Sequence, residues 1–319
     1  MKLAYKFNYP LEKRFLLIFI LISRFSFSQT YSLNNVNVGF NSILFVKHAF
    51  YEIGFNTKYH LPAWTFYSLT KEHLEIANLD RNGSFVKDPL LNAEQAKNND
   101  YAASGFDKGH MVPCEDMSFS EQAMHETFYY SNCAPQTTEL NRGEWKVLEE
   151  LSRQWGKEYG EVIVISGPVF EKNMRTMGED RIPIPNSFYK IILRHEAKAY
   201  KAIGFVLPNS TTTLNELPNY VCSVDSIEKL TALDFFTDLP DNIESQFESV
   251  ANIKDWNFDH HHSVSSSAPG GAVENHHKND SIVKSNSVAV QCSAITKKGK
   301  RCKNTTTSVS GLCNQHQKK

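Results

Sequence analysis

The sequence predicts an α+β fold, in which helices flank a largely antiparallel central sheet. Strand and helix patterns alternate irregularly along residues 29–250, without the β-α-β rhythm of a doubly wound sheet. Hydrophobic residues make up 41% of the 319 residues and charged residues 22%. This composition is typical of a globular protein and excludes a wholly disordered chain.

Three apolar runs predict buried strands. Residues 161–168 form a run that ends in a Gly-Pro turn, and residues 187–193 form a second run. Residues 199–207 form the third, with Pro208-Asn209 as its stop signal. The sheet is therefore expected to draw strands from the second half of the globular region.

Two segments have helical signals. Residues 141–155 carry large apolar side chains on one helical face, at Trp145, Leu148, Leu151 and Trp155. Residues 226–233 form the second segment, with Ser226 as the expected N-cap. Both helices are expected to pack one apolar face against the sheet.

The first 28 residues have the composition of a secretory signal peptide. A basic stretch precedes the apolar run 15–22, and Ser26-Phe27-Ser28 supplies small residues for cleavage before Gln29. The apolar run is too short to span a bilayer, although an uncleaved anchor is the alternative. The expectation is a periplasmic or secreted protein with no membrane span in its mature form.

Composition divides the rest of the chain into three parts. Residues 29–256 have the mixed hydrophobic patterning of a globular domain, and residues 257–291 are rich in His, Ser and Gly and nearly free of large apolar side chains. The second stretch is expected to be a flexible linker. Residues 292–319 form a separate basic tail.

One region carries a set of groups suited to phosphodiester hydrolysis. His110 follows a glycine and is a natural general base. Asn132 and Asn141 offer neutral oxygen ligands for a hard cation, and Glu149 lies two helical turns after Asn141. Arg81 supplies a guanidinium that can grip a phosphate. Each residue alone has a simpler structural explanation, such as a helix cap, but the combination favours metal-assisted chemistry.

Three sequence blocks resemble those of the DNA/RNA non-specific endonucleases, a family with a ββα-metal core. The family hallmark Asp-Arg-Gly-His corresponds to Asp107-Lys108-Gly109-His110. A Ser-Asn-x-x-Pro-Gln block is matched by residues 131–136, and a Leu-Asn-x-Gly-x-Trp block by residues 140–145. The resemblance covers roughly residues 55–250.

The resemblance implies a role for each matching residue. His110 would activate the attacking water, and Asn141 would be the direct ligand of one Mg²⁺ or Mn²⁺. Glu149 would orient a water on that metal, and Arg81 would stabilise the transition-state charge. Asn132 would orient groups around the site. The implied substrates are DNA and RNA, cut without strong sequence or sugar specificity.

The hallmark block departs from the family at one position. Asp107 is expected to hold its neighbours at the strand end, but Lys108 replaces the family's arginine. A lysine is a point charge and cannot make a bidentate phosphate contact, so phosphate binding is expected to differ in geometry. Base and metal ligand are untouched, and activity is still expected.

The tail contains three thiols and one imidazole, at Cys292, Cys302, Cys313 and His316. This set suits tetrahedral Zn²⁺, and so short a segment needs a metal or a disulfide in order to fold. A disulfide with one spare thiol is the alternative. In the catalytic region, a bridge between Cys114 and Cys133 is conceivable but is not fixed by the sequence.

The net charge of −1 hides an uneven distribution. The residues up to Arg24 hold five basic and one acidic side chain, and the tail holds seven basic and no acidic ones. The body between them is therefore acidic, with a net charge of −12. Metal and local cations would have to attract a polyanion there.

Two other functions fit the sequence less well. One is a catalytically decayed protein that binds nucleic acid or a surface through its tail, and the other is a phosphodiesterase acting on small extracellular nucleotides.

Overall fold

The computed structural model describes residues 42–196, 199–211, 216–258, 290–291 and 305–306. The chain divides into two compact units, residues 1–264 and 265–319. In the second unit, β12 (Val290–Gln291) pairs antiparallel with β13 (Thr305–Thr306). The expected signal peptide and the four predicted zinc ligands lie outside the described residues, and so does most of the expected linker.

The first unit is built on a seven-stranded sheet in the order β1-β2-β3-β6-β9-β10-β11, with every neighbouring pair antiparallel. Its strands are β1 (Ile43–Lys47), β2 (Tyr51–Asn56), β3 (Leu61–Thr70), β6 (Glu161–Pro168), β9 (Ser187–Glu196), β10 (Ala199–Pro208) and β11 (Val221–Cys222). The predicted α+β class is confirmed. The predicted strand at 161–168 has the same bounds as β6, while β9 and β10 run slightly longer than expected.

Both faces of the sheet are covered, as the side chains of β6 show. Val162 and Val164 belong to one hydrophobic core, and Ile163 and Ile165 belong to a second core on the opposite face. This alternation with period two is what a strand buried on both faces requires. The continuous apolar run that predicted this strand therefore reflects burial between two layers.

The first face is covered by the layer that carries the candidate site. The long helix α6 (Glu144–Tyr159) packs against it through Leu148, Leu151 and Trp155. A separate antiparallel ribbon of β4 (Asp107–His110) and β5 (Cys133–Gln136) precedes this helix, with Asp107 opposite Gln136. The smaller helices of this part are α2 (Lys71–Ile76), α3 (Asn98–Tyr101), α4 (Glu121–Thr127) and α5 (Thr138–Arg142).

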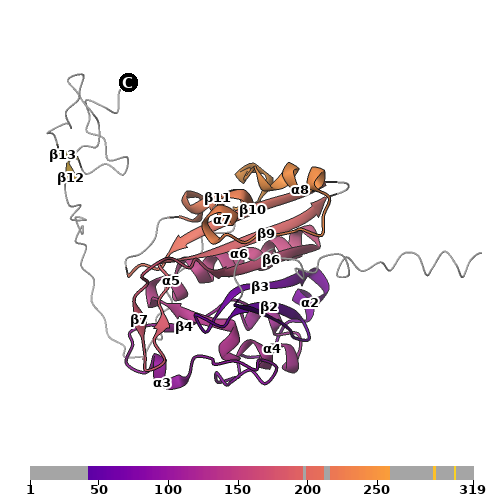
Figure 1. Cartoon of the computed structure of the whole chain (residues 1–319). Helices are drawn as coiled ribbons and strands as arrows, with labels where there is room; N and C mark the ends of the chain where they lie inside the picture. Colours follow the sequence, from indigo (N-terminus) through magenta and orange to yellow (C-terminus); the bar gives the residue numbers. More distant parts are fainter. Residues whose placement is uncertain (1–41, 197–198, 212–215, 259–289, 292–304, 307–319) are drawn as a thin grey trace, which may run out of the picture. The chain divides into compact units, whose positions relative to one another are not determined.

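The second face is covered by α7 (Val224–Thr231) and α8 (Asp241–Glu248), which lie over β10 (Figure 1). Ile227 and Phe247 enter the second core. The predicted cap of α7, Ser226, was wrong by one turn. The N-cap is Ser223, whose hydroxyl oxygen accepts a hydrogen bond from the Ser226 N–H at 3.3 Å. The apolar spacing located the helix, but Ser223 and Ser226 are both acceptable caps by type.

The predicted helix 141–155 is two helices in the structure. Thr137 caps α5, and the helical conformation is interrupted at Gly143 before α6 begins. A Cβ at Gly143 would lie 2.3 Å from the Glu139 carbonyl oxygen, so the close approach at this break needs a glycine. Asn141 therefore lies near the end of a short helix instead of starting the long one.

The remaining elements are short. They are β7 (Thr176–Met177), β8 (Ile182–Pro183) and the 3₁₀ turns η4 (Glu115–Met117), η5 (Tyr130–Asn132), η6 (Leu217–Tyr220) and η7 (Ile253–Asp255). Among the described residues, no helix combines the length and the apolar character needed to cross a bilayer.

Candidate active site

A cleft of about 600 Å³ opens where β4, α5 and α6 meet the segment around Arg81. Six of the seven site residues predicted in the globular region line it: Arg81, Asp107, Lys108, His110, Asn141 and Glu149. These residues are spread over almost 70 positions of sequence. The ribbon and the two helices therefore bring together the base, the cations and the oxygen donors that the sequence predicted.

His110 is the last residue of β4, and its side chain is almost fully buried. The rings of Phe85 and Phe128 lie 4.8 and 5.2 Å from the imidazole, and Nε2 has no hydrogen-bond partner within the described residues. Burial, reinforced by the nearby Arg81 cation, lowers the pKa of His110 to about 3. The imidazole is therefore neutral at neutral pH and retains a lone pair that can accept a proton.

Two contacts fix the position of His110. The Trp145 indole N–H donates to the His110 carbonyl oxygen at 3.2 Å, which ties α6 to the end of β4. A Cβ at Gly109 would lie 2.0 Å from Oε1 of the buried Gln136 side chain. The glycine before the histidine is thus required by the close packing of β4 on β5.

Asp107 organises the start of the same ribbon. Its Oδ2 accepts a hydrogen bond from Asn141 Nδ2 at 3.0 Å, and Arg142 binds both carboxylate oxygens at 2.9 and 3.0 Å. These hydrogen bonds hold the pKa of Asp107 below its usual value, against the opposing effect of burial. Because the amide nitrogen of Asn141 is engaged, its oxygen remains as the acceptor on that side chain.

Glu149 lies on α6 and is buried, and within the described residues nothing donates a hydrogen bond to it. Burial raises the pKa of Glu149 to about 8, while the Lys190 cation opposes this increase. Lys190 reaches the region from β9, fully buried, with its Nζ 4.5 Å from the centre of the Trp145 ring. The carboxylate of Glu149 is therefore supported by a buried positive charge and not by a direct hydrogen bond.

Asp116 and Arg153 form a largely buried ion pair, and both influence the charge of Glu149. Arg153 Nη1 lies 2.6 Å from Asp116 Oδ1, and the Tyr67 hydroxyl donates to Asp116 Oδ2 at 2.8 Å. Asp107 and Asp116 are thus each paired with an arginine, and Lys190 lowers the cost of burying Glu149.

The cations at the mouth of the cleft are more exposed. Arg81 Nη1 lies 3.8 Å from Glu115 Oε1, and its guanidinium lies 5.4 Å from the centre of the Phe128 ring. Lys108 Nζ donates to Asn98 Oδ1 at 2.7 Å and lies near the rings of Phe85 and Tyr101. Both cations have their charge at the solvent side, where a phosphate can reach it.

Asn132 is the predicted site residue that does not line the cleft. It is fully buried, and its side chain exchanges hydrogen bonds of 2.9 Å with both the N–H and the carbonyl of Val112. A third hydrogen bond, also 2.9 Å, goes to the Thr127 carbonyl. Asn132 therefore fixes the backbone two residues after His110 and does not face a ligand.

The cleft also contains residues to which the sequence assigned no role. The most informative are Arg142, at the end of α5, and Lys146 and Arg153, which share one face of α6 with Glu149 at positions 146, 149 and 153. This spacing of three and four residues is the available sequence signal. Glu115 and Phe85 also line the cleft, but no sequence pattern distinguishes them.

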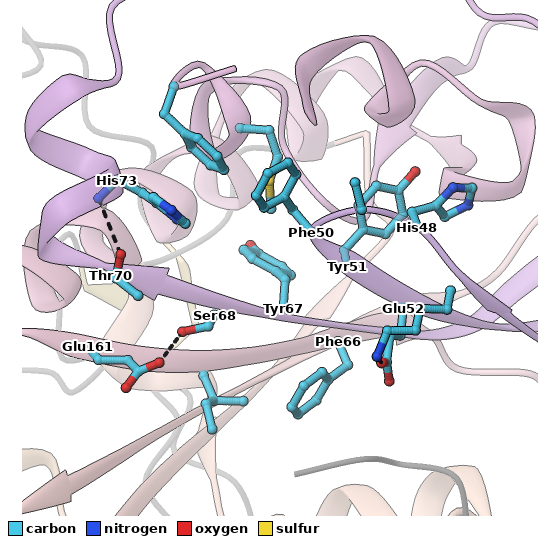
Figure 2. Close-up of a pocket in the computed structure, with 15 residues that line it drawn as sticks. His48, Phe50, Tyr51, Glu52, Phe66, Tyr67, Ser68, Thr70, His73 and Glu161 are labelled. Atoms are coloured by element: carbon cyan, nitrogen blue, oxygen red, sulfur yellow. Dashed lines mark hydrogen bonds and ion pairs between the residues drawn. The ribbon is translucent and has the colours of Figure 1, made fainter. Parts of the chain in front are cut away.

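A second cavity, of about 490 Å³, lies around β2 and β3 and is lined largely by aromatic side chains, including Phe50, Phe66 and Phe119 (Figure 2). The ring of His73 stacks on Phe119 with centroids 3.9 Å apart. The residues that line this cavity include no arginine and no asparagine. It therefore lacks the guanidinium and amide groups that line the first cleft.

Cys114 and Cys133 are buried free thiols, and Cys222 is a partly buried free thiol. The conceivable bridge between Cys114 and Cys133 is not formed.

The ribbon β4–β5 followed by α6 is a ββα unit, and it presents a neutral histidine, cations and oxygen donors to one cleft. Fold and site together define a nuclease, which is a hydrolase of phosphodiester bonds. The chain belongs to the DNA/RNA non-specific endonuclease family, whose model matches residues 30–242. The resemblance noted in the sequence blocks is confirmed, and the family depends on a divalent metal.

Several known proteins are similar to this chain. Nuclease 1, mitochondrial, of Schizosaccharomyces pombe is 31% identical over 234 residues, which is 66% of this chain and 72% of that protein. The mitochondrial nuclease of Saccharomyces cerevisiae is 33% identical over 58% of this chain and 63% of its own length. Nuclease EXOG, mitochondrial, of Xenopus laevis is 33% identical over 61% of this chain and 58% of its own. The match thus spans less than two thirds of the latter two proteins.

A solved structure has the same fold. The crystal structure of the EndoG/EndoGI complex contains a chain with a TM-score of 0.58 and 27% identity, matching 62% of this chain and 88% of that one.

The expected periplasmic or secreted location is contradicted by these relatives, several of which are mitochondrial nucleases. The expectation rested on a basic stretch followed by an apolar run. Such a pattern is compositional, and the composition of a short N-terminal segment does not by itself decide the compartment.

Proposed function

We propose that this chain is a divalent-metal-dependent endonuclease that hydrolyses DNA and RNA without strong sequence or sugar specificity. The observation that carries the proposal is the single cleft shared by His110, Arg81, Asn141 and Glu149. Its donors are suited to phosphate and water, and phosphate contacts carry no sequence information. Both DNA and RNA present the same phosphodiester group to such a site.

The oxygen donors of the cleft fit a hard cation such as Mg²⁺ or Mn²⁺. Asn141 keeps its amide oxygen available because its nitrogen is bound to Asp107. Glu149 is a buried carboxylate without a hydrogen-bond donor within the described residues, a state that favours a nearby cation. In this proposal Asn141 would be the direct ligand of the cation, and Glu149 would orient a water in its hydration shell.

His110 acts as the general base. It removes a proton from the attacking water, whose oxygen forms a bond to phosphorus while the bond to the leaving oxygen breaks. Approach of the anionic phosphate raises the proton affinity of His110 above that of the free site. The divalent ion, when bound, supplies Lewis-acid stabilisation of the charge on the phosphoryl oxygens.

Arg81 and Lys108 act on the substrate charge. The exposed Arg81 guanidinium can donate two parallel hydrogen bonds to the phosphoryl oxygens of the transition state. Lys108 supplies a point charge near the same cleft and holds the neighbouring phosphate less rigidly than an arginine. Asp107 holds Asn141 and Arg142, and Asn132 holds the backbone after His110.

The direct test is cleavage of plasmid DNA and of RNA by the purified protein with Mg²⁺, with Mn²⁺ and with chelator. We expect cleavage of both polymers, lost with chelator, and a decrease in kcat of about 10²–10⁴-fold in His110→Ala. The matched control is His125→Ala, since His125 is exposed on α4 outside the cleft. Intact polymers under all metal conditions, or a fully active His110→Ala protein, would contradict the proposal.

A further inference from the structure

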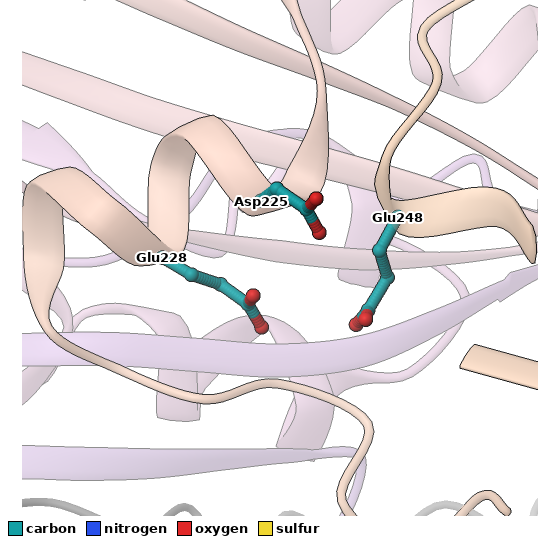
Figure 3. Close-up of side chains that lie close together, drawn as sticks. All are labelled: Asp225, Glu228 and Glu248. Atoms are coloured by element: carbon teal, nitrogen blue, oxygen red, sulfur yellow. The ribbon is translucent and has the colours of Figure 1, made fainter. Parts of the chain in front are cut away.

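Three carboxylates meet between the two helices of the second face. Asp225 and Glu228 lie one turn apart on α7, and Glu248 is the last residue of α8. One oxygen atom of each lies within 4.8 Å of the others, and the three side chains point toward one another (Figure 3). We call these three residues the acid cluster.

Within the described residues, no cation pairs with the acid cluster. Glu248 is 7% exposed, and its Oε1 has no hydrogen-bond partner within the described residues. Among the described residues, the Glu228 side chain receives one hydrogen bond, from the Phe235 N–H at 2.8 Å. No lysine or arginine of the described chain forms an ion pair with any member of the cluster, whereas Asp234 and Glu244 add further negative charge nearby.

Such an arrangement is costly unless a positive charge or protons neutralise it. Burial, followed by the repulsion from Glu228 and Glu244, raises the pKa of Glu248 to about 9. Burial is also the main cause that raises the pKa of Glu228 to about 7. In the acid cluster, one buried carboxylate points at two others and has no hydrogen-bond donor. This arrangement is expected of a cation site without its cation.

We propose that the acid cluster binds a divalent cation, Ca²⁺, between α7 and α8. Calcium takes oxygen ligands at about 2.3–2.6 Å, so two ligands on opposite sides of the ion lie about 4.6–5.2 Å apart. Three carboxylate oxygen atoms that lie within 4.8 Å of one another can all reach one ion at such distances. Mg²⁺ binds at about 2.0–2.1 Å and demands near-ideal octahedral geometry, so it fits the cluster less well.

The site is independent of the proposed nuclease chemistry, because it lies with the core on the opposite face of the sheet. Ile227 on α7 and Phe247 on α8 both belong to that second core. A cation held by both helices would fix them to each other and thereby to the sheet. The expected effect of Ca²⁺ is thus on stability and not on the chemical step.

The test uses the full chain with Asn141→Ala, which removes the direct ligand assigned to the active-site metal. Calorimetric titration with CaCl₂ is expected to show one site with a Kd of roughly 10⁻⁵–10⁻³ M. Ca²⁺ at about 100 times Kd is expected to raise Tm by roughly 5–10 °C. Mg²⁺ is expected to bind more weakly, and a tighter Mg²⁺ constant would overturn the choice of ion.

Adding Glu248→Gln to this background removes one charge at nearly constant shape. We expect at least a tenfold loss of Ca²⁺ affinity together with a higher Tm in Ca²⁺-free buffer, since repulsion is relieved.

Asp241→Asn is the control, because Asp241 is an exposed acid at the other end of α8. Asp225→Asn, at an exposed position, repeats the test should Glu248→Gln fail to fold. Unchanged Ca²⁺ binding in the cluster variants, or no Ca²⁺ binding in the Asn141→Ala background, would overturn the proposal.

Discussion

The cleft and the acid cluster both gather carboxylates, but only the cleft also gathers cations. Asp107 faces Arg142, Asp116 faces Arg153, and Glu149 is supported by Lys190. In the acid cluster, Asp225, Glu228 and Glu248 face one another and no described cation.

This difference separates two uses of negative charge. Acids that are paired with arginine or lysine hold those cations in place and leave little net charge to repel a polyanion. Acids that are left unpaired raise the energy of the folded chain until protons or a metal ion neutralise them. The first arrangement suits an anionic substrate, and the second suits a cation.

The largest effect that would test this comparison concerns Arg81, the exposed cation of the cleft. Arg81→Ala is expected to lower kcat by about 10²–10³-fold, which is typical for loss of one group that stabilises transition-state charge. Arg81→Lys should recover part of the rate, because a point charge replaces the bidentate contact. Steady-state cleavage of a short duplex measures both variants.

Arg175→Ala serves as the control for Arg81, since Arg175 is also exposed but does not line the cleft. Its kcat should equal that of the unchanged protein. Equal rates for Arg81→Ala and Arg175→Ala would show that Arg81 contributes only general surface charge.

A smaller effect is expected from the buried cation Lys190. Lys190→Met leaves Glu149 buried without its positive neighbour, and the free energy of unfolding should fall by about 3 kcal/mol. The double variant with Glu149→Gln should regain most of that loss, because both charges are then absent. Urea denaturation of the two variants gives the comparison.

Lys201→Met provides the matched control for a surface ion pair. Lys201 Nζ lies 2.8 Å from Asp255 Oδ1, but both side chains are about one third exposed. Its loss should cost less than about 1 kcal/mol. If Lys190→Met were as mild as Lys201→Met, the support of Glu149 by Lys190 would be refuted.

The sequence reveals the local part of this architecture. His110 and Asn141 stand in short blocks whose residue types are specific to the chemistry, and the buried strand at 161–168 is a continuous apolar run. The break at Gly143 was missed because Asn141 is by type an acceptable helix start, and the apolar pattern of α6 begins only at Trp145, after the break. Hydrophobic periodicity predicts which face of a helix is buried, but it does not locate the residue at which the helix begins.

The non-local part could not be predicted. Lys190 interrupts the apolar run of β9, and only the pairing of β9 with β6 places its side chain below α6. Glu248 comes to Asp225 and Glu228 from a different helix, 20 residues further along the chain. Charges that meet through sheet register or helix packing leave no spacing signal in one sequence.

The smallest expected effect is the pH dependence of stability caused by the acid cluster. The pKa values of Glu248, Glu228 and Glu244 are raised, by burial and by neighbouring acids that include Asp225 and Asp234, to about 9, 7 and 7. A raised carboxyl pKa means that the folded chain retains protons that the unfolded chain has released. Its stabilising contribution is therefore complete below about pH 4 and is lost as pH rises through the folded pKa.

In Ca²⁺-free buffer, Tm should therefore fall between pH 6 and pH 9, by roughly 2–4 °C for each kcal/mol lost. Glu149 adds a dependence of the same sign, so the informative quantity is the difference between the unchanged protein and Glu248→Gln, in which the fall should be smaller. Ca²⁺ should also reduce the fall, because a bound cation stabilises the ionised carboxylates and lowers their pKa values. If the two proteins lose Tm equally over this range, with or without Ca²⁺, the unpaired acids of the second face do not differ energetically from the paired acids of the cleft.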